Sequence, residues 1–299
     1  MDICLKTFDG LRASESLHPL HAGDLLYTQI LSTISDADLP VTLSILGSTI
    51  LYGQEQLTTL ILANFLSLNQ ETFYWTLRRV HSVMEVPPAP EAPRLCLLLY
   101  RSSFADYLSD PVRSGRFAID EGTVHLKVAR QGFQWLRHAS RTKPDPLLLP
   151  EPSWIPDKIS RENIIHALKG YSISHCWRAC HRISDNLVAT LLKDLEEFDF
   201  YLEYETWDRW LVHDFAYFVR WLHSLDNTGS TLVSVENIDP LCPHELCHCD
   251  ATKDFLAPFN QASNRFINQG VHVRLGKSHQ VHFNLRVNPE LVSRSKIGR

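Results

Sequence analysis

Metal binding is the first chemistry that the residue types suggest. Residues 242–249 contain three cysteines and two histidines: Cys242, His244, Cys247, His248 and Cys249. A structural zinc ion takes four sulfur or nitrogen ligands in a tetrahedron, often from two closely spaced pairs. The Cys-x4-Cys-x-Cys spacing is uncommon for zinc, and the chain contains fifteen histidines in all. We therefore predict ordinary thiols here and no metal ligand, with a zinc-stabilised binding domain as an alternative.

A second group of thiols and imidazoles lies at His175–Cys176 and Cys180–His181, with the two cysteines one helical turn apart. These residues could add zinc ligands, or they could supply a nucleophile and its base. A catalytic pair needs a hydrogen bond between the side chains, which adjacency in the sequence does not provide. The chain also has no Gly-x-Ser-x-Gly motif, the turn that exposes a nucleophilic serine. We predict no catalytic residue and no enzyme activity.

The segment Gly270–Ser278 (GVHVRLGKS) is close to a phosphate-binding loop, whose pattern is Gly-x4-Gly-Lys-Ser/Thr. Val271 stands where that pattern requires its first glycine. A phosphate loop is also followed by a helix, whose N-terminus meets the phosphates. Here the residues after Ser278 alternate apolar and polar, as in a strand. The segment is predicted to be a hairpin turn, so no nucleotide or other cofactor is expected.

DNA binding is a further alternative. Arg78, Arg79 and His81 are predicted to lie on the third helix of a winged-helix pattern, and such a helix often enters the major groove. Phosphate binding needs a broad basic surface, whereas the neighbouring loop contributes Glu85 and Glu91. The formal net charge of the chain is −5, which does not favour a nucleic-acid partner. A winged-helix DNA-binding protein is kept only as an alternative reading.

The elements that position these residues follow from apolar spacing between residues 36 and 108. A first helix is predicted from an amphipathic stripe: Leu39, Leu43, Leu46 and Ile50. A second covers 54–62, and a third follows Ser67, which has Gln70 at capping-box spacing. The third helix carries its own stripe: Phe73, Leu77, Val80 and Met84. A proline-rich loop and the strand 94–100 come next, and 83–86 can pair with that strand. Three helices and a two-stranded ribbon make a winged-helix pattern.

The flanking segments are predicted to be mostly helical. Further helices are expected at 25–34, after Ser102, at 122–138, from Ser160 through Leu168, and over these ranges: 176–181, 185–198, 207–225 and 254–267. Alternating residues at 271–275 and 281–287 predict a β-hairpin. The predicted fold class is therefore mainly α: a helical bundle with a winged-helix-like subdomain and a small β-hairpin near the C-terminus.

A proline-rich segment is predicted to divide the chain. Five prolines fall between residues 144 and 156, so this segment cannot be a helix or a central strand. The predicted organisation is a winged-helix-like and helical region at 1–142, a linker at 143–157, and a helical region ending in the hairpin at 158–299. The leucines at 147–149 suggest that the linker docks against one of the two regions.

Three segments together resemble fungal NACHT-type signalling NTPases of the STAND class. They are Asp24–Leu31 (DLLYTQIL), Leu77–Val83 (LRRVHSV) and Ser103–Leu108 (SFADYL). In that family, segments in this order follow the nucleotide-binding core and form a helical piece, a winged helix and a turn into later helices. The resemblance covers residues 20–140. Tyr100 or Arg101 stands where the family tends to have histidine, and the nucleotide-binding core itself is absent from this sequence.

The resemblance implies a non-enzymatic intracellular interaction and regulatory module whose partner is a NACHT-type relative or a neighbouring domain. Composition agrees with a packed protein, since 44% of the residues are hydrophobic. Seven cysteines, an odd number, indicate reduced thiols. The first twenty residues lack the apolar core of a signal peptide, and no run reaches the roughly twenty apolar residues of a membrane span. A cytoplasmic location without membrane association is expected.

Overall fold

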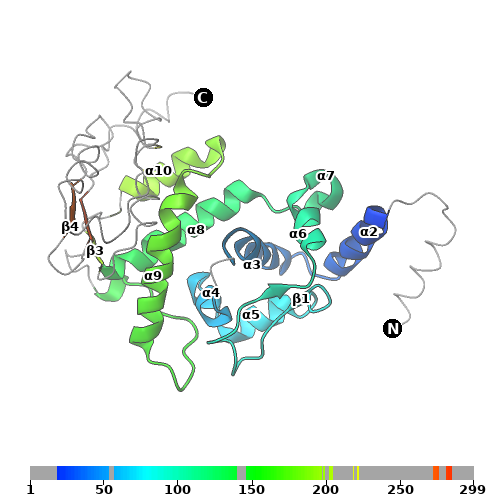
Figure 1. Ribbon diagram of the computed structural model, residues 1–299, viewed down its shortest axis with the longest axis horizontal. Helices are drawn as coiled ribbons and strands as arrows, with labels where there is room; N and C mark the ends of the chain where they lie inside the picture. The colour runs from blue at the N-terminus through cyan, green and yellow to red at the C-terminus, as the bar shows by residue number, and fades with distance from the viewer. Residues whose placement is uncertain are drawn as a thin grey trace. The chain divides into compact units, whose positions relative to one another are not determined.

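The computed structural model describes residues 19–53, 57–139, 146–196, 198, 202–204, 218, 221, 272–275 and 281–284. By its internal contacts the chain forms two compact units, here called the first unit (Met1–Ala63 with Leu68–Glu121) and the second unit (Asn64–Ser67 with Gly122–Arg299). This division comes at Glu121, ahead of the segment 143–157 that the sequence predicted as a linker. The described part of the chain is mainly helical, as predicted (Figure 1).

The first unit contains nearly all of the stretch with the winged-helix pattern. Its helices and strands are α2 (Pro19–Ser32), α3 (Leu39–Tyr52), α4 (Thr59–Phe65), α5 (Gln70–Leu77), β1 (Met84–Glu85), β2 (Leu98–Leu99), α6 (Ser102–Ser109), α7 (Pro111–Ser114) and the 3-10 turn η2 (Gly115–Phe117). The last residues of α4 belong to the second unit. Leu39, Ile45, Leu46 and Tyr52 of α3 are buried, in agreement with its apolar stripe.

A small antiparallel ribbon follows α5, as the sequence predicted. Met84 pairs with Leu99, and Glu85 pairs with Leu98. An isolated bridge joins Thr58, just before α4, to Cys96 on the other arm of the ribbon. The proline-rich loop between the strands also supplies carbonyl groups to α4: Thr59 N–H donates to Leu95 at 2.8 Å and Leu60 N–H to Ala92 at 3.0 Å. These bonds satisfy N–H groups that a helix start leaves unpaired.

Helix α5 differs from its prediction at both ends. Ser67 has a φ of 59°, and the helix is capped instead by Asn69, whose side chain accepts from Thr72 N–H at 2.8 Å. The helix ends at Leu77 rather than reaching Met84. Arg78 accounts for this end, because its guanidinium donates to the Trp75 carbonyl and lies 3.6 Å above the Trp75 ring. A cationic side chain on a late carbonyl is a common way to finish a helix.

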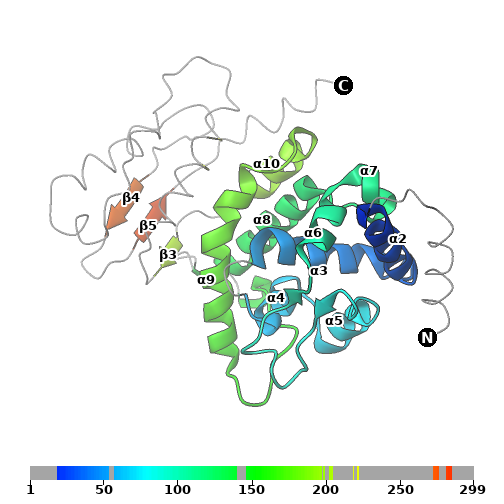
Figure 2. The same cartoon turned by 45° about the vertical axis from the view of Figure 1, so that its right-hand side comes forward.

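The second unit is built on two long helices. Its elements are α8 (Glu121–Leu136, of which Glu121 falls in the first unit), η3 (Arg137–Ala139), η4 (Pro146–Leu148), α9 (Arg161–Cys180), η5 (Asp185–Leu187), α10 (Val188–Glu196), β3 (Leu202–Tyr204), β4 (His272–Leu275) and β5 (Val281–Asn284). Figures 1 and 2 show α8 crossing α9. Strand β5 pairs antiparallel with both β3 and β4. The predicted helices at 207–225 and 254–267 lie outside the described residues, apart from residues 218 and 221.

One continuous helix replaces the two that the sequence predicted between residues 160 and 181. Ser160 caps it as expected, since its hydroxyl accepts from Asn163 N–H at 3.2 Å. The helix then runs through Gly170 to Cys180. Trp177 and Leu168 are fully buried on either side of this glycine. Tertiary packing therefore outweighs the low helix propensity of a single interior glycine, which amounts to about 1 kcal/mol.

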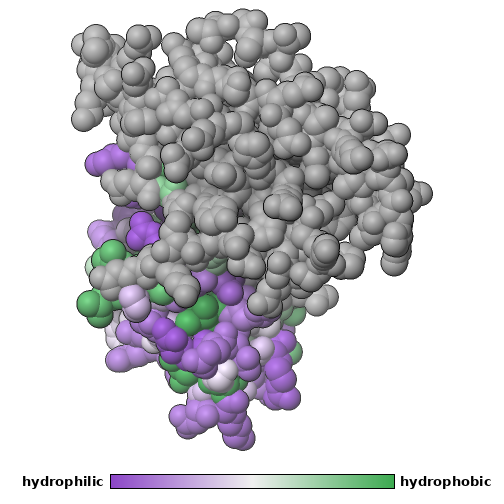
Figure 3. Space-filling model, turned by 90° about the vertical axis from the view of Figure 1, so that its left-hand side faces the viewer, coloured by the Kyte–Doolittle hydropathy of each residue, from purple (hydrophilic) through white to green (hydrophobic). Residues whose placement is uncertain are grey.

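The proline-rich segment is anchored to the second unit by Trp154 and not by its leucines. Asn64 Nδ2 donates to the Trp154 carbonyl at 2.8 Å, and the Trp154 N–H donates back to Asn64 Oδ1 at 2.9 Å. Both side chains are buried, whereas Leu147 is 90% and Leu148 66% exposed. In Figure 3, the described surface is mainly hydrophilic with hydrophobic side chains in small groups. The segment is thus attached by two hydrogen bonds between the Asn64 amide and the Trp154 backbone, whereas the sequence suggested that its leucines would dock.

Candidate interaction site

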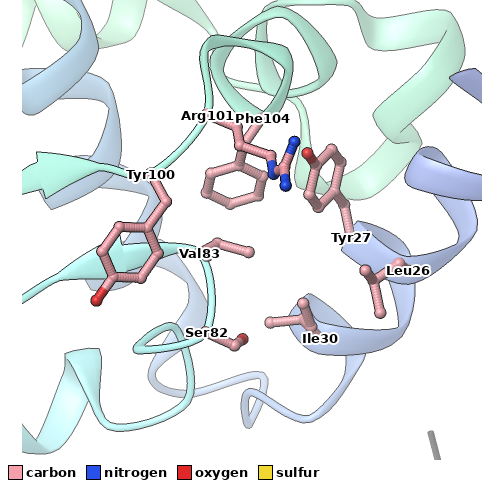
Figure 4. A pocket seen from close by; sticks show the side chains of 8 residues that line it. All are labelled: Leu26, Tyr27, Ile30, Ser82, Val83, Tyr100, Arg101 and Phe104. Carbon is pink, nitrogen blue, oxygen red and sulfur yellow. The ribbon is translucent and has the colours of Figure 1, made fainter.

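A groove in the first unit brings together the three segments that carry the family resemblance. The cavity measures about 210 Å³ and is here called the α2–α6 groove (Figure 4). It is lined by Leu26, Tyr27, Ile30, Ser82, Val83, Tyr100, Arg101 and Phe104. Helix α2 contributes the first three, the turn before β1 the next two, and the start of α6 and the residues before it the last three. Residues as far apart in the chain as Leu26 and Phe104 therefore form one surface.

Aromatic rings and hydroxyl pairs join the two helical walls of this groove. The Tyr27 ring lies 5.0 Å from Phe104 and 5.5 Å from Tyr107, measured between ring centroids. The Tyr27 hydroxyl shares a hydrogen bond of 2.9 Å with the Ser103 hydroxyl, and Thr28 shares one of 2.7 Å with Tyr107. Tilted aromatic pairs of this kind add about 0.5–1.5 kcal/mol each beyond the burial of their surface.

A bidentate salt bridge between Asp24 and Arg113 joins α2 to α7 beside the groove. Arg113 Nε donates to Asp24 Oδ2 at 3.0 Å, and Arg113 Nη2 donates to Asp24 Oδ1 at 2.6 Å. This hydrogen bonding raises the pKa of Arg113 above its ordinary value. Two parallel N–H···O bonds fix the relative orientation of the groups as well as their distance. The ion pair therefore fixes the position of α2, which forms one wall of the groove, relative to α7.

The lining of the groove is chemically suited to contact and not to reaction. Most of it is carbon, and the Tyr27 hydroxyl is already bonded to Ser103. Its volume is below the roughly 300–1,000 Å³ of cofactor and small-molecule sites. Arg101 is the charged member of the lining, and its side chain is exposed. An apolar side chain of another molecule fits this combination better than a cofactor does.

Sequence reasoning quoted most of these residues but did not place them in one site. The family-like segments contain six of the lining residues: Leu26, Tyr27, Ile30, Ser82, Val83 and Phe104. Tyr100 and Arg101 stand where the sequence departs from the family. Leu98 in β2 and Tyr100 just after it are 56% and 57% exposed, which the apolar run of the sequence does not reveal. Contiguous exposed apolar patches, rather than single exposed residues, mark interaction surfaces.

The basic residues considered for DNA binding are placed differently from one another. Arg78 forms a salt bridge with Asp38, with 3.2 Å between Nη2 and Oδ2. Hydrogen bonds from Ser35 first, and then Arg78, lower the pKa of the Asp38 carboxyl. Arg79 and His81 are exposed. The Arg78 guanidinium already binds Asp38 and lies over the Trp75 ring, so it would have to leave these partners to bind a DNA phosphate.

The described thiols are not arranged for metal binding or nucleophilic chemistry. Cys176 and Cys180 are both buried in α9, and burial raises the pKa of the Cys180 thiol well above its ordinary value. A metal ligand or nucleophile needs the thiolate, which such burial disfavours. Among the described residues, no group of three or more His, Cys, Asp or Glu could hold a metal ion. Residues 242–249 and Lys277 lie outside the described residues.

Two histidines of the second unit are buried in the neutral form. Burial, with a smaller effect of the Arg178 guanidinium, lowers the pKa of His175 to about 3. Arg178 Nη2 lies 3.1 Å from His175 Nδ1, which suits an imidazole that accepts at this nitrogen. Burial lowers the pKa of His125 to about 4, aided by Arg182, His181 and Arg178. These imidazoles are therefore structural groups with a pH-dependent contribution to stability.

Acid is expected to destabilise the second unit through these histidines. The unfolded chain protonates them near pH 6.5, whereas the folded protein keeps them neutral to about pH 4. The unfolded state binds more protons between these values, so stability is complete at neutral pH and falls as the pH drops below 6.5. We expect a loss of about 1 kcal/mol per imidazole between about pH 7 and 5.5, measured by denaturant unfolding. A His175→Phe variant should lose less, and an unchanged pH dependence in that variant would contradict this assignment.

Neither the search for a membrane-spanning helix nor the comparison with known proteins assigns the chain to a class. In the part of the chain that the structure describes, no helix is long and apolar enough to cross a membrane. No family model, curated protein or solved structure matches the chain.

Proposed function

We propose that this chain is a non-enzymatic interaction and regulatory module, and that the α2–α6 groove is its contact surface for another protein. The observation that carries the proposal is the convergence of three separate segments on one apolar groove with rigid walls. Preformed apolar grooves with exposed aromatic and arginine side chains at the edge have the composition of protein interfaces. No arrangement of titratable side chains lines this groove that would suit catalysis instead.

We further propose a winged-helix subdomain over residues 39–99. Support comes from the order of its elements: α3, the bridge residue Thr58, α4, α5, β1, the proline-rich loop and β2. The pairing order also supports it, because the second arm of the ribbon pairs with β1 through Leu98–Leu99 and with Thr58 through Cys96. The predicted C-terminal hairpin is supported in the same way by the antiparallel register of β4 and β5.

In NACHT-type NTPases the corresponding region packs beside the nucleotide-binding core and relays its state. By that resemblance, the module would contact a NACHT-type relative or a neighbouring domain, and it would work in the cytoplasm. The groove supplies a physical basis for such a role, since hydrogen bonds from Tyr27 to Ser103 and from Thr28 to Tyr107 join α2 to α6. DNA binding is less well supported, because Arg78 is engaged by Asp38.

The proposal predicts that a charge in the groove removes the partner. Leu26 is 37% exposed, so Leu26→Glu should leave the fold intact while placing a carboxylate on the apolar wall. Burying that carboxylate without a partner is unfavourable, so we expect at least about a tenfold loss of binding. The measurement is quantitative affinity capture with the full-length chain, in which partners are compared between the wild type and the variant. A nucleotide-binding NACHT-type protein is the expected loss.

Val112→Glu is the matched control, since Val112 is 93% exposed in α7 and does not line the groove. It should retain every partner of the wild type. A protein lost equally from both variants, or retained by both, would contradict the role of the groove. Calorimetric titration with ATP tests the enzyme alternative directly, and tight ATP binding by the purified chain would contradict a non-enzymatic module.

A further inference from the structure

We propose that the α2–α6 groove recognises a protein segment in which a large apolar side chain is accompanied by a carboxylate. This inference rests on the proposed function and adds the chemistry of the partner. The apolar side chain would occupy the cavity, and the carboxylate would bind the Arg101 guanidinium at its edge. The occupant is thus an acidic, amphipathic segment of another protein.

The size of the groove selects a side chain over a whole ligand. The cavity of about 210 Å³ is lined by Leu26, Ile30, Val83 and the Phe104 ring, among others. Interfaces obtain most of their affinity from a few large side chains that enter such well-packed hollows. In Figure 4, the space between α2 and the turn at Ser82–Val83 is faced by aliphatic groups from both sides. An aliphatic or aromatic anchor residue would be desolvated there against a lining that is mainly apolar.

The charge at the edge selects an acidic partner. The Arg101 side chain is exposed, and its guanidinium has no hydrogen-bond or ion-pair partner among the residues that the structure describes. Arg101 is one of the side chains that line the cavity (Figure 4). Three other arginines of the first unit are paired: Arg113 with Asp24, Arg78 with Asp38, and Arg116 with Asp36. Arg79 and Arg94 are exposed but do not line the groove.

The guanidinium of Arg101 therefore remains available for a carboxylate from outside. A guanidinium can bind a carboxylate through two parallel hydrogen bonds. Such a bidentate pair is stronger and more specific than one hydrogen bond. Because Arg101 lines the cavity, the carboxylate that binds it and the apolar side chain that fills the cavity must lie close together in the partner. In a helical partner, such a pair lies three or four residues apart.

The test is selection from a phage-displayed library of random 16-residue peptides on four immobilised full-length baits. These are the wild type, Leu26→Glu, Arg101→Glu and the control Arg94→Glu, which changes an exposed arginine that does not line the groove. We expect the wild type and the control to enrich peptides that combine a large apolar residue with an acidic one. We expect Arg101→Glu to lose these peptides about tenfold or more and to favour basic ones.

The outcomes separate the two levels of the proposal. Peptides that lack an acidic residue, or that bind Arg101→Glu as well as the wild type, would overturn the charge assignment and leave the groove as an interface. Enrichment that is the same on Leu26→Glu would overturn the proposed function itself. Stronger binding of dodecanoate than of the selected peptides would reassign the groove to a lipid. A concentration-dependent dimer that Leu26→Glu abolishes would reassign it to a second copy of the chain.

Discussion

Replacing Gly132 by alanine is expected to lower the free energy of unfolding of the second unit by about 3 kcal/mol. Gly132 lies where α8 crosses α9, and a Cβ atom there would stand 2.6 Å from the Cβ of Cys176. That distance is too short for two carbon atoms, so the helices must move apart. Alanine improves helix propensity by only about 1 kcal/mol, which does not offset the overlap. The measurement is denaturant-induced unfolding monitored by circular dichroism.

A second substitution identifies the clash as the cause. With the Cys176 side chain removed, the nearest atoms to the new Cβ would be the Cys176 Cα at 3.6 Å and the Ser172 carbonyl at 3.7 Å, which are ordinary contacts. The double variant Gly132→Ala/Cys176→Gly should therefore be more stable than the sum of the single effects predicts, by about 1–3 kcal/mol. Additive effects would contradict the packing explanation.

Gly23→Ala is the matched control in α2. Its Cβ would lie 3.9 Å from the Tyr27 ring, an ordinary van der Waals contact. This variant should be as stable as the wild type or up to about 1 kcal/mol more stable, because only helix propensity changes. The contrast between two glycine-to-alanine changes in helices then isolates the close approach of α8 and α9.

Asn64→Ala is the second substitution for which a large effect is expected. It removes both hydrogen bonds between the Asn64 amide and the backbone of Trp154 and leaves a buried N–H and a buried carbonyl without these bonds. Each buried polar group left unpaired costs about 1–3 kcal/mol, so a total loss of about 3 kcal/mol is expected. The midpoint of chemical denaturation is the quantity to compare.

Asn163→Ala is the control for this change. Asn163 is exposed in α9, and none of its side-chain atoms takes part in a hydrogen bond that the structure describes. Its replacement should alter stability by no more than about 0.5 kcal/mol. Asn64→Asp adds a sharper comparison, because it retains the acceptor for the Trp154 N–H but loses the donor to the carbonyl. If Asn64→Asp were as stable as the wild type, the two-way bond would not be what anchors this segment.

Local sequence signals predicted helices and turns well where a single segment contains the whole cause. The apolar stripe of α3, the Ser160 cap of α9 and the ribbon across the proline-rich loop are each of this kind. The errors arose where a distant or competing group intervenes. Asn69 replaces Ser67 as the cap of α5, and Arg78 ends that helix by binding the Trp75 carbonyl.

The candidate site was less accessible to sequence reasoning than the elements around it. The sequence identifies each segment by its residues, but the walls of the groove are joined by contacts between them: Tyr27 with Ser103 and Asp24 with Arg113. These contacts join positions far apart in the chain, and no spacing rule connects them. The same holds for Asn64 and Trp154, which are ninety residues apart and determine where the proline-rich segment is attached.

The amino-acid sequence by itself determined a mainly helical chain, because apolar periodicity, caps and prolines act within a few residues. It also determined the order of helices and ribbon between residues 36 and 108. Only the tertiary structure decided the close crossing at Gly132, the anchor at Trp154 and the groove bordered by Arg101. Those features depend on complementary shape and paired polar groups between remote segments, which arise only when the chain packs.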